Sequence, residues 1–600
     1  MPRRIAFRFC FLLLASQTFL STAELANTAP AVRQSYAVVR TSVPAVDPDY
    51  IYNQLFYMVT HYQRREAGYD NNLPVDVNGH DEFAMYWAQE MIRNLGDFGA
   101  QVFRDPFSIK GWQGRPAKVP AFNVEVSVPG ITHSEQIVVI GCHYDGEAIS
   151  NQSAFDDASG CAIELGVARA MSEYWRATHT YPARTVRFVI FDAEEQGLYG
   201  SFHYLNSTIN GDIHNVVAMI NEEQNGIAYP LRYLGKASNP LYPFYISLSP
   251  LQNNSAFPDQ SRLTQQQKAA IADFRSLMRQ AIAPTFTLFR SEGFQNLTYH
   301  SDNGQDIAQP IFTPDQASNI TVQDDPGLGS DQVPFTLAGV ACATLSGNYQ
   351  PDPQYPQIPG YPYDTPVDTI QLMNTFADGS SMQSQALTLA LAVPGQLTSW
   401  MLQQPDVLGA AAADGKPIAE ISDIGQTLVN RPIAFDARAS FDPRQSATPL
   451  TYSWDFGDGA TATGISVEHL YKATGMYTLT LRVHAASSAR TLSKVIAITN
   501  KAAFINNPYT SFNFNGIIPT PPGMPVANDK LTDVVSPKSL ASGPTSSTNQ
   551  APTTRKAPAT PGPQPSISPF MLAVAGIVVL GGSAAIVYLL MRRRRKNLQV

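Results

Sequence analysis

Two adjacent carboxylates, Glu194 and Glu195, follow an apolar run that ends at Asp192. Such a pair can divide the work of a hydrolytic metal site, because one carboxylate can hold the ion while its neighbour takes a proton from water. Adjacent residues at the end of a strand can also point in different directions, so each could serve one role. The hypothesis requires further ligand-type residues to converge on the same place.

Further ligand-type residues follow the other apolar runs of this region. The segment GCHYDG places His143 and Asp145 two positions apart in sequence, and therefore on the same side of an extended chain. Ligands of open α/β sheets bind beyond the carboxyl ends of the strands, so we expect the groups that follow these runs to lie together. The later members of the set are Asp156 and Asp157 in SAFDDASG, Glu222 and Glu223 in NEEQNG, and Asp364 and Asp368 in GYPYDTPVDT.

An isolated acidic pair is usually a loop or helix-cap feature, and we expect Asp157 to be only a helix-entry residue. Several successive strand ends that each carry a carboxylate, the first with a histidine, need another explanation. Clustered like charges raise one another's pKa unless a cation neutralises them. The set therefore predicts a metal site that holds one ion or two.

The elements that must position these residues are visible as an alternation of segments between about residues 35 and 405. Short apolar runs rich in β-branched residues alternate with segments of helical periodicity, which predicts an α/β fold. Continuous apolar strands further predict a mostly parallel sheet with helices on both faces. Residues 227–330 are loop-rich around one helix-like segment, and we interpret them as an insertion. The expected strands are 121–128, 136–143, 185–192, 215–221 and 339–346.

The remainder of the chain changes character three times. Residues 412–500 show short alternating strands separated by turn residues, as in a β-sandwich. Residues 501–568 are rich in Pro, Ser and Thr, which predicts an extended, disordered stalk. Residues 570–591 form an uncharged apolar run that is long enough to be a transmembrane helix.

The two ends of the chain predict a single-pass membrane protein whose N-terminal bulk is extracellular. Residues 1–23 combine basic residues, an apolar run and a small-residue cleavage site, as a secretory signal peptide does. The basic run that opens residues 592–600 predicts a short cytoplasmic tail.

The net charge of −8 understates the acidity of the part between these ends, because eight of the 41 basic residues lie in the signal and the tail. An acidic ectodomain argues against nucleic acid as a partner, since nucleic-acid binding requires basic surface. Three cysteines remain after signal removal, namely Cys142, Cys161 and Cys342. Three cannot all pair, and each lies in an apolar context, so we expect buried small side chains rather than a disulfide framework.

The acidic segments, taken in order, resemble the co-catalytic zinc exopeptidases. This family includes leucyl aminopeptidases, glutamate carboxypeptidase and, more remotely, glutaminyl cyclase. The resemblance covers about residues 130–375 and rests on the blocks HYD, AFDDASG, DAEEQGLYGS, INEEQNG, SDQVPFTLAGVACATL and YDTPVDTI. It implies two divalent metal ions, usually zinc, in the α/β fold expected above. It further implies that His143 binds metal and Asp145 orients it, Asp156 bridges both ions, Glu194 is the general base, and Glu195, Glu223 and Asp364 stand at ligand positions.

Two of these positions depart from the family pattern. Glu223 replaces an aspartate, which keeps the ligand atoms and lengthens the arm. Asp364 replaces a histidine, which removes an imidazole and makes the ligand set harder than zinc usually favours. The alternatives are a single ion, a harder ion such as manganese or magnesium, weak binding, or substitution by His300 from the insertion. Gln332 also replaces a histidine of many relatives, at a position that need not bind metal.

Residues 452–483 closely resemble a PKD module, an immunoglobulin-like β-sandwich whose pattern includes WDFGDG. We expect Trp454 and Tyr477 in its core. In relatives such modules serve as spacers or bind polysaccharide or protein surfaces. The stalk that follows favours the spacer role.

These features together predict a membrane-anchored extracellular exopeptidase that acts on peptide or protein substrates, and an aminopeptidase is the leading hypothesis. The alternative is a catalytically inactive ectodomain that acts as receptor, scaffold or adhesin. The substitution at Asp364 favours this alternative, whereas the presence of His143, Asp156, Glu194 and Glu195 opposes it. A third hypothesis is aminoacyl cyclisation, as in glutaminyl cyclase.

Overall fold

The computed structural model describes residues 45–67, 79–110, 118–227, 244–300, 306–318, 320–327, 329–347, 361–378, 380, 383–404, 410–412, 414–444 and 449–501. All of them belong to one compact unit, Met1–Ile517. The signal peptide, transmembrane helix and cytoplasmic tail expected from the sequence lie outside the described residues, as does the stalk beyond Lys501. Within these ranges no helix has both the length and the apolar character needed to cross a membrane.

An eight-stranded mixed sheet forms the first domain, in the order β1-β2-β5-β3-β6-β11-β7-β10. The four central strands, β5, β3, β6 and β11, are mutually parallel, as the sequence predicts. The pairings β1–β2, β2–β5 and β11–β7 are antiparallel, whereas the edge pair β7–β10 is parallel, so the sheet is mixed rather than mostly parallel. The strands are β1 (Gln101–Lys110), β2 (Lys118–Val128), β3 (His133–His143), β5 (Arg184–Phe191), β6 (Val216–Glu223), β7 (Phe244–Leu248), β10 (Thr321–Asp324) and β11 (Cys342–Gly347).

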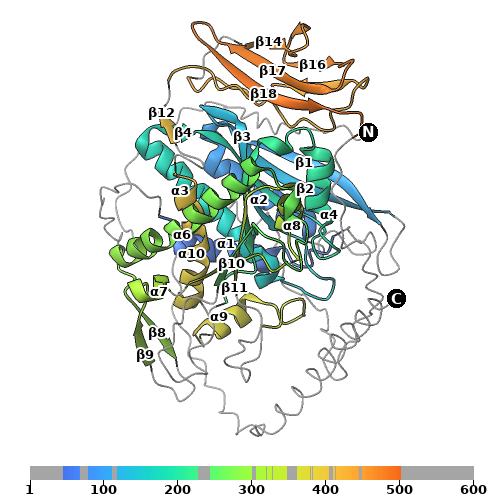
Figure 1. Ribbon diagram of the computed structural model, residues 1–600. Coiled ribbons are helices and arrows are strands. Elements are labelled where there is room, and N and C mark those ends of the chain that lie inside the picture. The colour runs from blue at the N-terminus through green and yellow to red at the C-terminus, as the bar shows by residue number, and fades with distance from the viewer. Residues whose placement is uncertain are drawn as a thin grey trace, which may run out of the picture. The chain divides into compact units, whose positions relative to one another are not determined.

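Helices cover both faces of this sheet, as expected, and strand alternation sorts the core between them (Figure 1). On one face Val138 and Ile140 belong to the large core cluster with α1, α2, α3, α6, α9 and α10. On the other face Val139 and Met219 pack with Leu205 and with Phe335 of α8. The helices are α1 (Pro48–His61), α2 (His80–Leu95), α3 (Ser159–Thr178), α4 (Tyr199–His203), α6 (Gln265–Ser291), α7 (Pro314–Ser318), α8 (Gln332–Ala338), α9 (Ile370–Asp378) and α10 (Gln385–Met401).

Residues 227–330, which the sequence suggests are an insertion, contribute β7 and β10 to the main sheet. Their long helix, α6, begins at a capping box in which Thr264 and Gln267 each bond the other's backbone N–H. A separate hairpin of β8 (Asn296–His300) and β9 (Asp306–Pro310) lies outside the main sheet.

Residues 414–499 fold as two small sheets, β13–β16 and β15–β14–β17–β18. Trp454 is buried in their common core, as predicted, whereas Tyr477 is only half-buried at its edge. The fully buried tyrosine is Tyr471, whose hydroxyl donates to the backbone oxygen of Phe456. The strands are β13 (Ile433–Asp436), β14 (Thr451–Asp455), β15 (Thr461–Thr463), β16 (Ser466–His469), β17 (Gly475–His484) and β18 (Ala489–Ile498), and the short β12 (Ala410–Ala412) pairs with β4 (Thr180–Pro182) of the first domain.

Buried ion pairs join this β-sandwich to the first domain. Lys494 of β18 lies 3.2 Å from Asp212, and both side chains are fully buried. Arg187 of β5 is buried on the sheet face that carries Val139, where it pairs with Asp423 of the sandwich and with Glu125 of β2. Burying a charge in a protein interior is unfavourable unless an opposite charge pairs with it. The two domains therefore form a specific contact.

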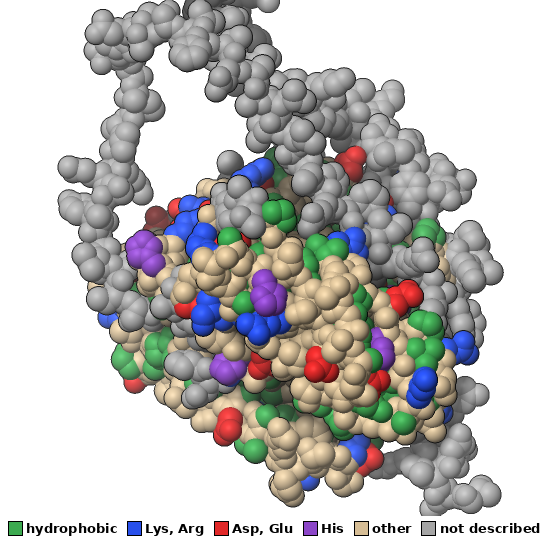
Figure 2. Space-filling view, turned by 90° about the horizontal axis from the view of Figure 1, so that it is seen from above, with side chains coloured by type: hydrophobic (Ala, Val, Ile, Leu, Met, Phe, Trp, Pro, Cys, Tyr) green, Lys and Arg blue, Asp and Glu red, His purple; other side chains and the backbone are tan. Residues whose placement is uncertain are grey.

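The outer surface of the molecule carries both signs of charge. The face seen in Figure 2 has basic and acidic side chains interspersed among uncharged ones, and neither sign dominates it.

Candidate metal centre

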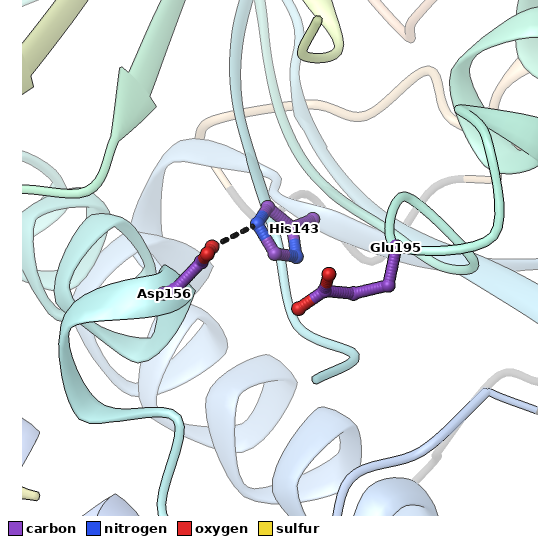
Figure 3. A group of neighbouring side chains, drawn as sticks. All are labelled: His143, Asp156 and Glu195. Carbon is purple, nitrogen blue, oxygen red and sulfur yellow. Dashed lines mark hydrogen bonds and ion pairs between the residues drawn. The ribbon is translucent and has the colours of Figure 1, made fainter. Parts of the chain in front are cut away.

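His143 ends β3, and its imidazole is fully buried between carboxylates from two other segments. Its Nε2 lies 2.9 Å from Asp156 Oδ1, while its Nδ1 lies 3.2 Å from the backbone oxygen of Asp145. Asp156 belongs to the turn at Ala154–Ala158 that leads into α3. Figure 3 shows the Glu195 side chain directed toward the same space as the imidazole and Asp156.

The two glutamates leave β5 through a tight turn that Asp145 holds from the neighbouring strand. The backbone N–H of Glu194 donates to Asp145 Oδ1 at 3.1 Å, and that of Glu195 donates to Oδ2 at 3.3 Å. Ala193, just before them, has a left-handed φ of 59°. Asp145, which also lies 3.5 Å from His143 Nδ1, therefore fixes three site residues at once.

Asp192, the first carboxylate of this segment, turns away from the site. It is fully buried and lies 2.9 Å from Nε2 of His80, at the start of α2. Burial lowers the pKa of His80, but the charges and hydrogen bonds of Asp192 and Asp81 together outweigh it and raise that pKa to about 10. The buried pair is a structural feature that the sequence analysis missed, because the partners are far apart in the chain.

Glu194 and Glu195 line a cavity of about 200 Å³ beyond the ends of the central strands. Glu223 enters it from β6, with Oε1 at 3.7 Å from His143 Nε2, and accepts a hydrogen bond from Ser330 through Oε2. The lining residues are Asp156, Glu194, Glu195, Glu223, Gln224, Gly329, Ser330, Ser346, Tyr363 and Asp364.

Several residues without an assigned role hold Asp156 in place. Gln224 donates from Nε2 to Asp156 Oδ2 at 2.8 Å. Asp368, fully buried, accepts the backbone N–H groups of Phe155 and Asp156 at 3.0 and 3.2 Å. Asp368 stands in an acidic loop that the sequence singles out, but its partners lie so far back in the chain that only the fold reveals them.

Asp157 is the helix-entry residue expected from the sequence, but it is not only that, because its carboxylate also falls within one of the potential ligand groups. Its Oδ1 accepts the backbone N–H of Gly160 at 3.0 Å in the first turn of α3, and that of Gln224 at 3.1 Å. Gly160 must lack a side chain, because a Cβ there would lie 2.2 Å from the backbone oxygen of Glu222. The turn is thereby pressed against the end of β6.

The clustered carboxylates disturb one another as a cation site predicts. Burial raises the pKa of Glu194 and of Glu195, and neighbouring carboxylates raise both further. Burial and Asp156 raise the pKa of Asp364 to about 10. Negative charges gathered in this way are stable together only when protons or cations neutralise them.

The arrangement of ligand atoms fits a divalent ion. Among the described residues, two overlapping groups have one potential ligand atom per residue within 4.8 Å of one another: His143 with Asp156 and Glu195, and His143 with Asp157 and Glu223. Glu195 Oε1, Asp364 Oδ1 and Asp157 Oδ2 are buried without a hydrogen-bond partner. Unpartnered buried oxygens beside an imidazole are the donors that such an ion would engage.

Asp364 and Gln332 depart from the family pattern, and His300 is the histidine that could substitute for the missing ligand. Asp364 lines the cavity and has a left-handed φ of 55°. His300 stands at the end of β8, outside the main sheet. Gln332 is buried and donates to Asp325 at 2.9 Å.

Comparison with protein families places this cavity in a known context. The model of Peptidase family M28 matches residues 123–309, the stretch that carries His143, Asp156, Glu194, Glu195 and Glu223. Residues 123–309 are thus similar to Peptidase family M28. The M28 region ends before Asp364, so the departure at that position lies outside the matched stretch. Residues 414–499 match the PKD domain.

Individual relatives of the M28 region are distant or match over short stretches. The chain is 41% identical over 83 residues to vacuolar protein sorting-associated protein 70 of Saccharomyces cerevisiae, covering 14% of this chain and 10% of that protein. It is 25% identical over 257 residues to a glutamate carboxypeptidase 2 homolog of Caenorhabditis elegans, covering 42% of this chain and 27% of that protein. Both matches therefore take in less than a third of the relative's length. A solved zinc aminopeptidase from Bacillus subtilis has 15% identity and a TM-score of 0.38, with 60% of this chain and 95% of that chain covered.

Proposed function

We propose that this protein is a metal-dependent exopeptidase, and specifically an aminopeptidase. The observation that carries the proposal is the convergence of ligand atoms of His143, Asp156 and Glu195 at the cavity, with Glu194 lining the cavity outside that ligand group. A hydrolytic centre needs this division between groups that hold the ion and one that stays free to move a proton.

His143, Asp156, Glu195, Glu223 and Asp364 are the residues that would hold metal. Their four carboxylates balance the charge of two divalent cations, for which zinc is the family's usual ion and a harder ion is the alternative. When bound, the metal supplies Lewis acidity, which polarises the scissile carbonyl and makes water a better nucleophile at neutral pH.

The chain's own groups perform the remaining work. Glu194 takes the proton of the attacking water at its carboxylate and delivers it to the leaving amine. Asp145 orients the imidazole of His143 and, through two backbone hydrogen bonds, keeps Glu194 aimed into the cavity. Side-chain hydrogen bonds hold two further ligands, since Ser330 donates to Glu223 and Gln224 donates to Asp156.

The charge of the cavity favours recognition of an amino terminus. Its described lining contains five carboxylates and no lysine or arginine. Two divalent ions would balance the four ligand carboxylates and leave Glu194 as excess negative charge. Such a surface attracts the ammonium group of a peptide's first residue and repels a C-terminal carboxylate.

Digestion of paired peptides tests this direction. One peptide has a free amino terminus and an amidated carboxyl terminus, and its twin has an acetylated amino terminus and a free carboxyl terminus. With the full-length protein and added divalent ion, mass spectrometry should show stepwise loss of N-terminal residues from the first and no cleavage of the second. Shortening of the acetylated twin from its carboxyl end would contradict the proposal.

The proposal also includes export and anchoring. Residues 1–23 would direct the chain across a membrane, and residues 570–591 would hold it there with residues 592–600 in the cytoplasm. The stalk of residues 501–568 would hold the peptidase and PKD domains away from the bilayer. We assign the PKD domain the role of a spacer; binding of a polysaccharide or protein surface is the alternative.

The second candidate function is that of an inactive ectodomain that acts as receptor, scaffold or adhesin. The observation that favours it is Asp364, because a carboxylate at this position withdraws the second imidazole of the family's ligand set. The two candidates differ in whether divalent ions are bound.

A further inference from the structure

Two of the three buried cysteines lie next to His143 of the candidate metal centre. Cys142 immediately precedes His143 in β3, and Cys161 stands in the first turn of α3, five residues after Asp156. Both side chains are fully buried, and their Sγ atoms are 2.8 Å apart. The sequence predicts buried small side chains without a disulfide framework, and the structure has all three cysteines buried and free, but the contact between these two is a finding of the fold.

The contact is closer than ordinary packing. Non-bonded carbon atoms reach their optimal separation at about 3.5–4.0 Å, and these two sulfurs, which are larger atoms, approach well inside that distance. The surrounding backbone is equally close, because a Cβ on Gly160 would lie 2.9 Å from the Cβ of Cys142. Cys161 Sγ also lies 3.3 Å from the backbone oxygen of His143. The first turn of α3 is therefore held against the end of β3 at the two sulfurs.

The third cysteine is placed where it cannot join this pair. Cys342 of β11 belongs to the core cluster on the opposite face of the sheet from Cys142 and Cys161. Its Sγ lies 3.4 Å from the backbone oxygen of Val340. The fold thus selects one of the three pairings that three cysteines allow.

We infer that Cys142 and Cys161 form a disulfide that joins β3 to α3 under the metal centre. The inference rests on export to an oxidising compartment and is independent of peptidase activity. The thiolate of one cysteine attacks the disulfide of a thiol–disulfide oxidoreductase to give a mixed disulfide, and the second cysteine then displaces the enzyme's thiol. The two cysteines lose two electrons and two protons, and the oxidant's disulfide becomes two thiols.

The burial of both sulfurs determines when the bond forms. An oxidoreductase cannot reach them once α3 has packed on the sheet, so oxidation precedes that step and the finished bond is shielded from reductants. The bond closes the segment that contains Asp145 and Asp156. It thereby links the two chain segments that present His143 and Asp156 to each other and restrains their separation.

Peptide mapping of the full-length protein from a secretory host tests the inference. The protein is denatured and alkylated without reductant, then cleaved at aspartates, since Asp145 and Asp156 separate the two cysteines. Trypsin alone would leave both in one peptide, because residues 119–168 contain no lysine or arginine. The expected result is one species that joins the Cys142 and Cys161 peptides and separates on reduction, with Cys342 alkylated. Alkylation of Cys142 and Cys161 before reduction, or a link to Cys342, overturns the inference.

Single substitutions provide matched controls. The C342S variant should retain the cross-linked species, whereas C161S should free Cys142 for alkylation without reductant. Mapping of the unsubstituted chain decides the question by itself if C161S fails to fold. Persistence of the Cys142 link in folded C161S would contradict the assigned pairing.

Discussion

Replacing Glu194 by Gln should lower kcat for peptide hydrolysis by about 10²–10⁴-fold, the usual contribution of a general acid–base group. Glutamine preserves the size of the side chain but cannot take a proton from water. The backbone hydrogen bond from residue 194 to Asp145 does not involve the side chain and should persist. The fold and the bound metal should therefore be unchanged, and the loss should appear in kcat at equal metal content.

The neighbouring substitution Glu195→Gln is the matched control for this experiment. Glu195 belongs to the ligand group with His143 and Asp156, so its loss should lower metal content as well as activity. The pair of variants separates proton transfer from metal binding at adjacent positions. Hydrolysis by Glu194→Gln at the unsubstituted rate, with metal present, would remove Glu194 from the mechanism.

Replacing Lys494 by Met should lower the free energy of unfolding by about 3–5 kcal/mol, the usual cost of removing one partner from a buried ion pair. Lys494 and Asp212 are fully buried between the two domains, and Asp212 would lose the cation that contacts it directly. Two donors remain to Asp212, the backbone N–H of Ile424 and the side chain of Asn215, and these moderate the loss. Urea denaturation followed by tryptophan fluorescence measures the change.

An exposed lysine of the same domain provides the comparison. Lys472→Met should change stability by no more than about 0.5 kcal/mol, because surface substitutions rarely do more. The double variant Lys494→Met with Asp212→Asn should recover part of the loss, since the orphaned charge is then removed as well. Equal stability of Lys494→Met and Lys472→Met would show that the Lys494–Asp212 pair contributes nothing to folding.

The core of the site could be predicted from sequence because its residues follow buried parallel strands. Strands such as β3, β5 and β6 are recognisable in the sequence as short apolar runs, and the carboxyl ends of parallel neighbours must meet at one edge of the sheet. His143, Glu194 and Glu223 stand within a few residues of those ends. The convergence of Glu194 and Glu223 on one cavity, beside His143, is thus a consequence of topology that local patterns reveal.

Residues that reach the site from far away in the chain could not be predicted in the same way. Asp368 holds the backbone of Phe155 and Asp156 across more than two hundred residues. Asp192 stands two residues from Glu194 but turns to His80, because the left-handed Ala193 between them ends the extended chain, in which residues two apart would share a side. The local sequence around Asp368 and Asp192 shows neither which residue each one binds nor the direction in which its side chain points.

The edges of the sheet show a similar limit. The apolar run of β2 satisfies the pattern of a buried parallel strand, yet it is antiparallel to both of its neighbours. Burial on both faces makes a strand apolar whichever way its neighbours run, so the direction of pairing is not written in that run. The short connection at residues 111–117 is the better signal, since parallel strands require a longer crossover.

The contact between the domains was also hidden in the sequence. Arg187 lies within an apolar run, where an isolated charge is costly, which indicates that an oppositely charged side chain pairs with it. The partner, Asp423, comes from the other domain. Only the folded arrangement identifies it.

Metal analysis of the full-length protein tests the central claim most directly. The protein is purified without chelators, exchanged into metal-free buffer, and its divalent ions are quantified per chain by inductively coupled plasma mass spectrometry, alongside the His143→Ala variant. We expect two divalent ions per chain and a clear loss of ions in the variant. Absence of bound divalent ions from gently prepared protein would contradict it and favour the inactive ectodomain.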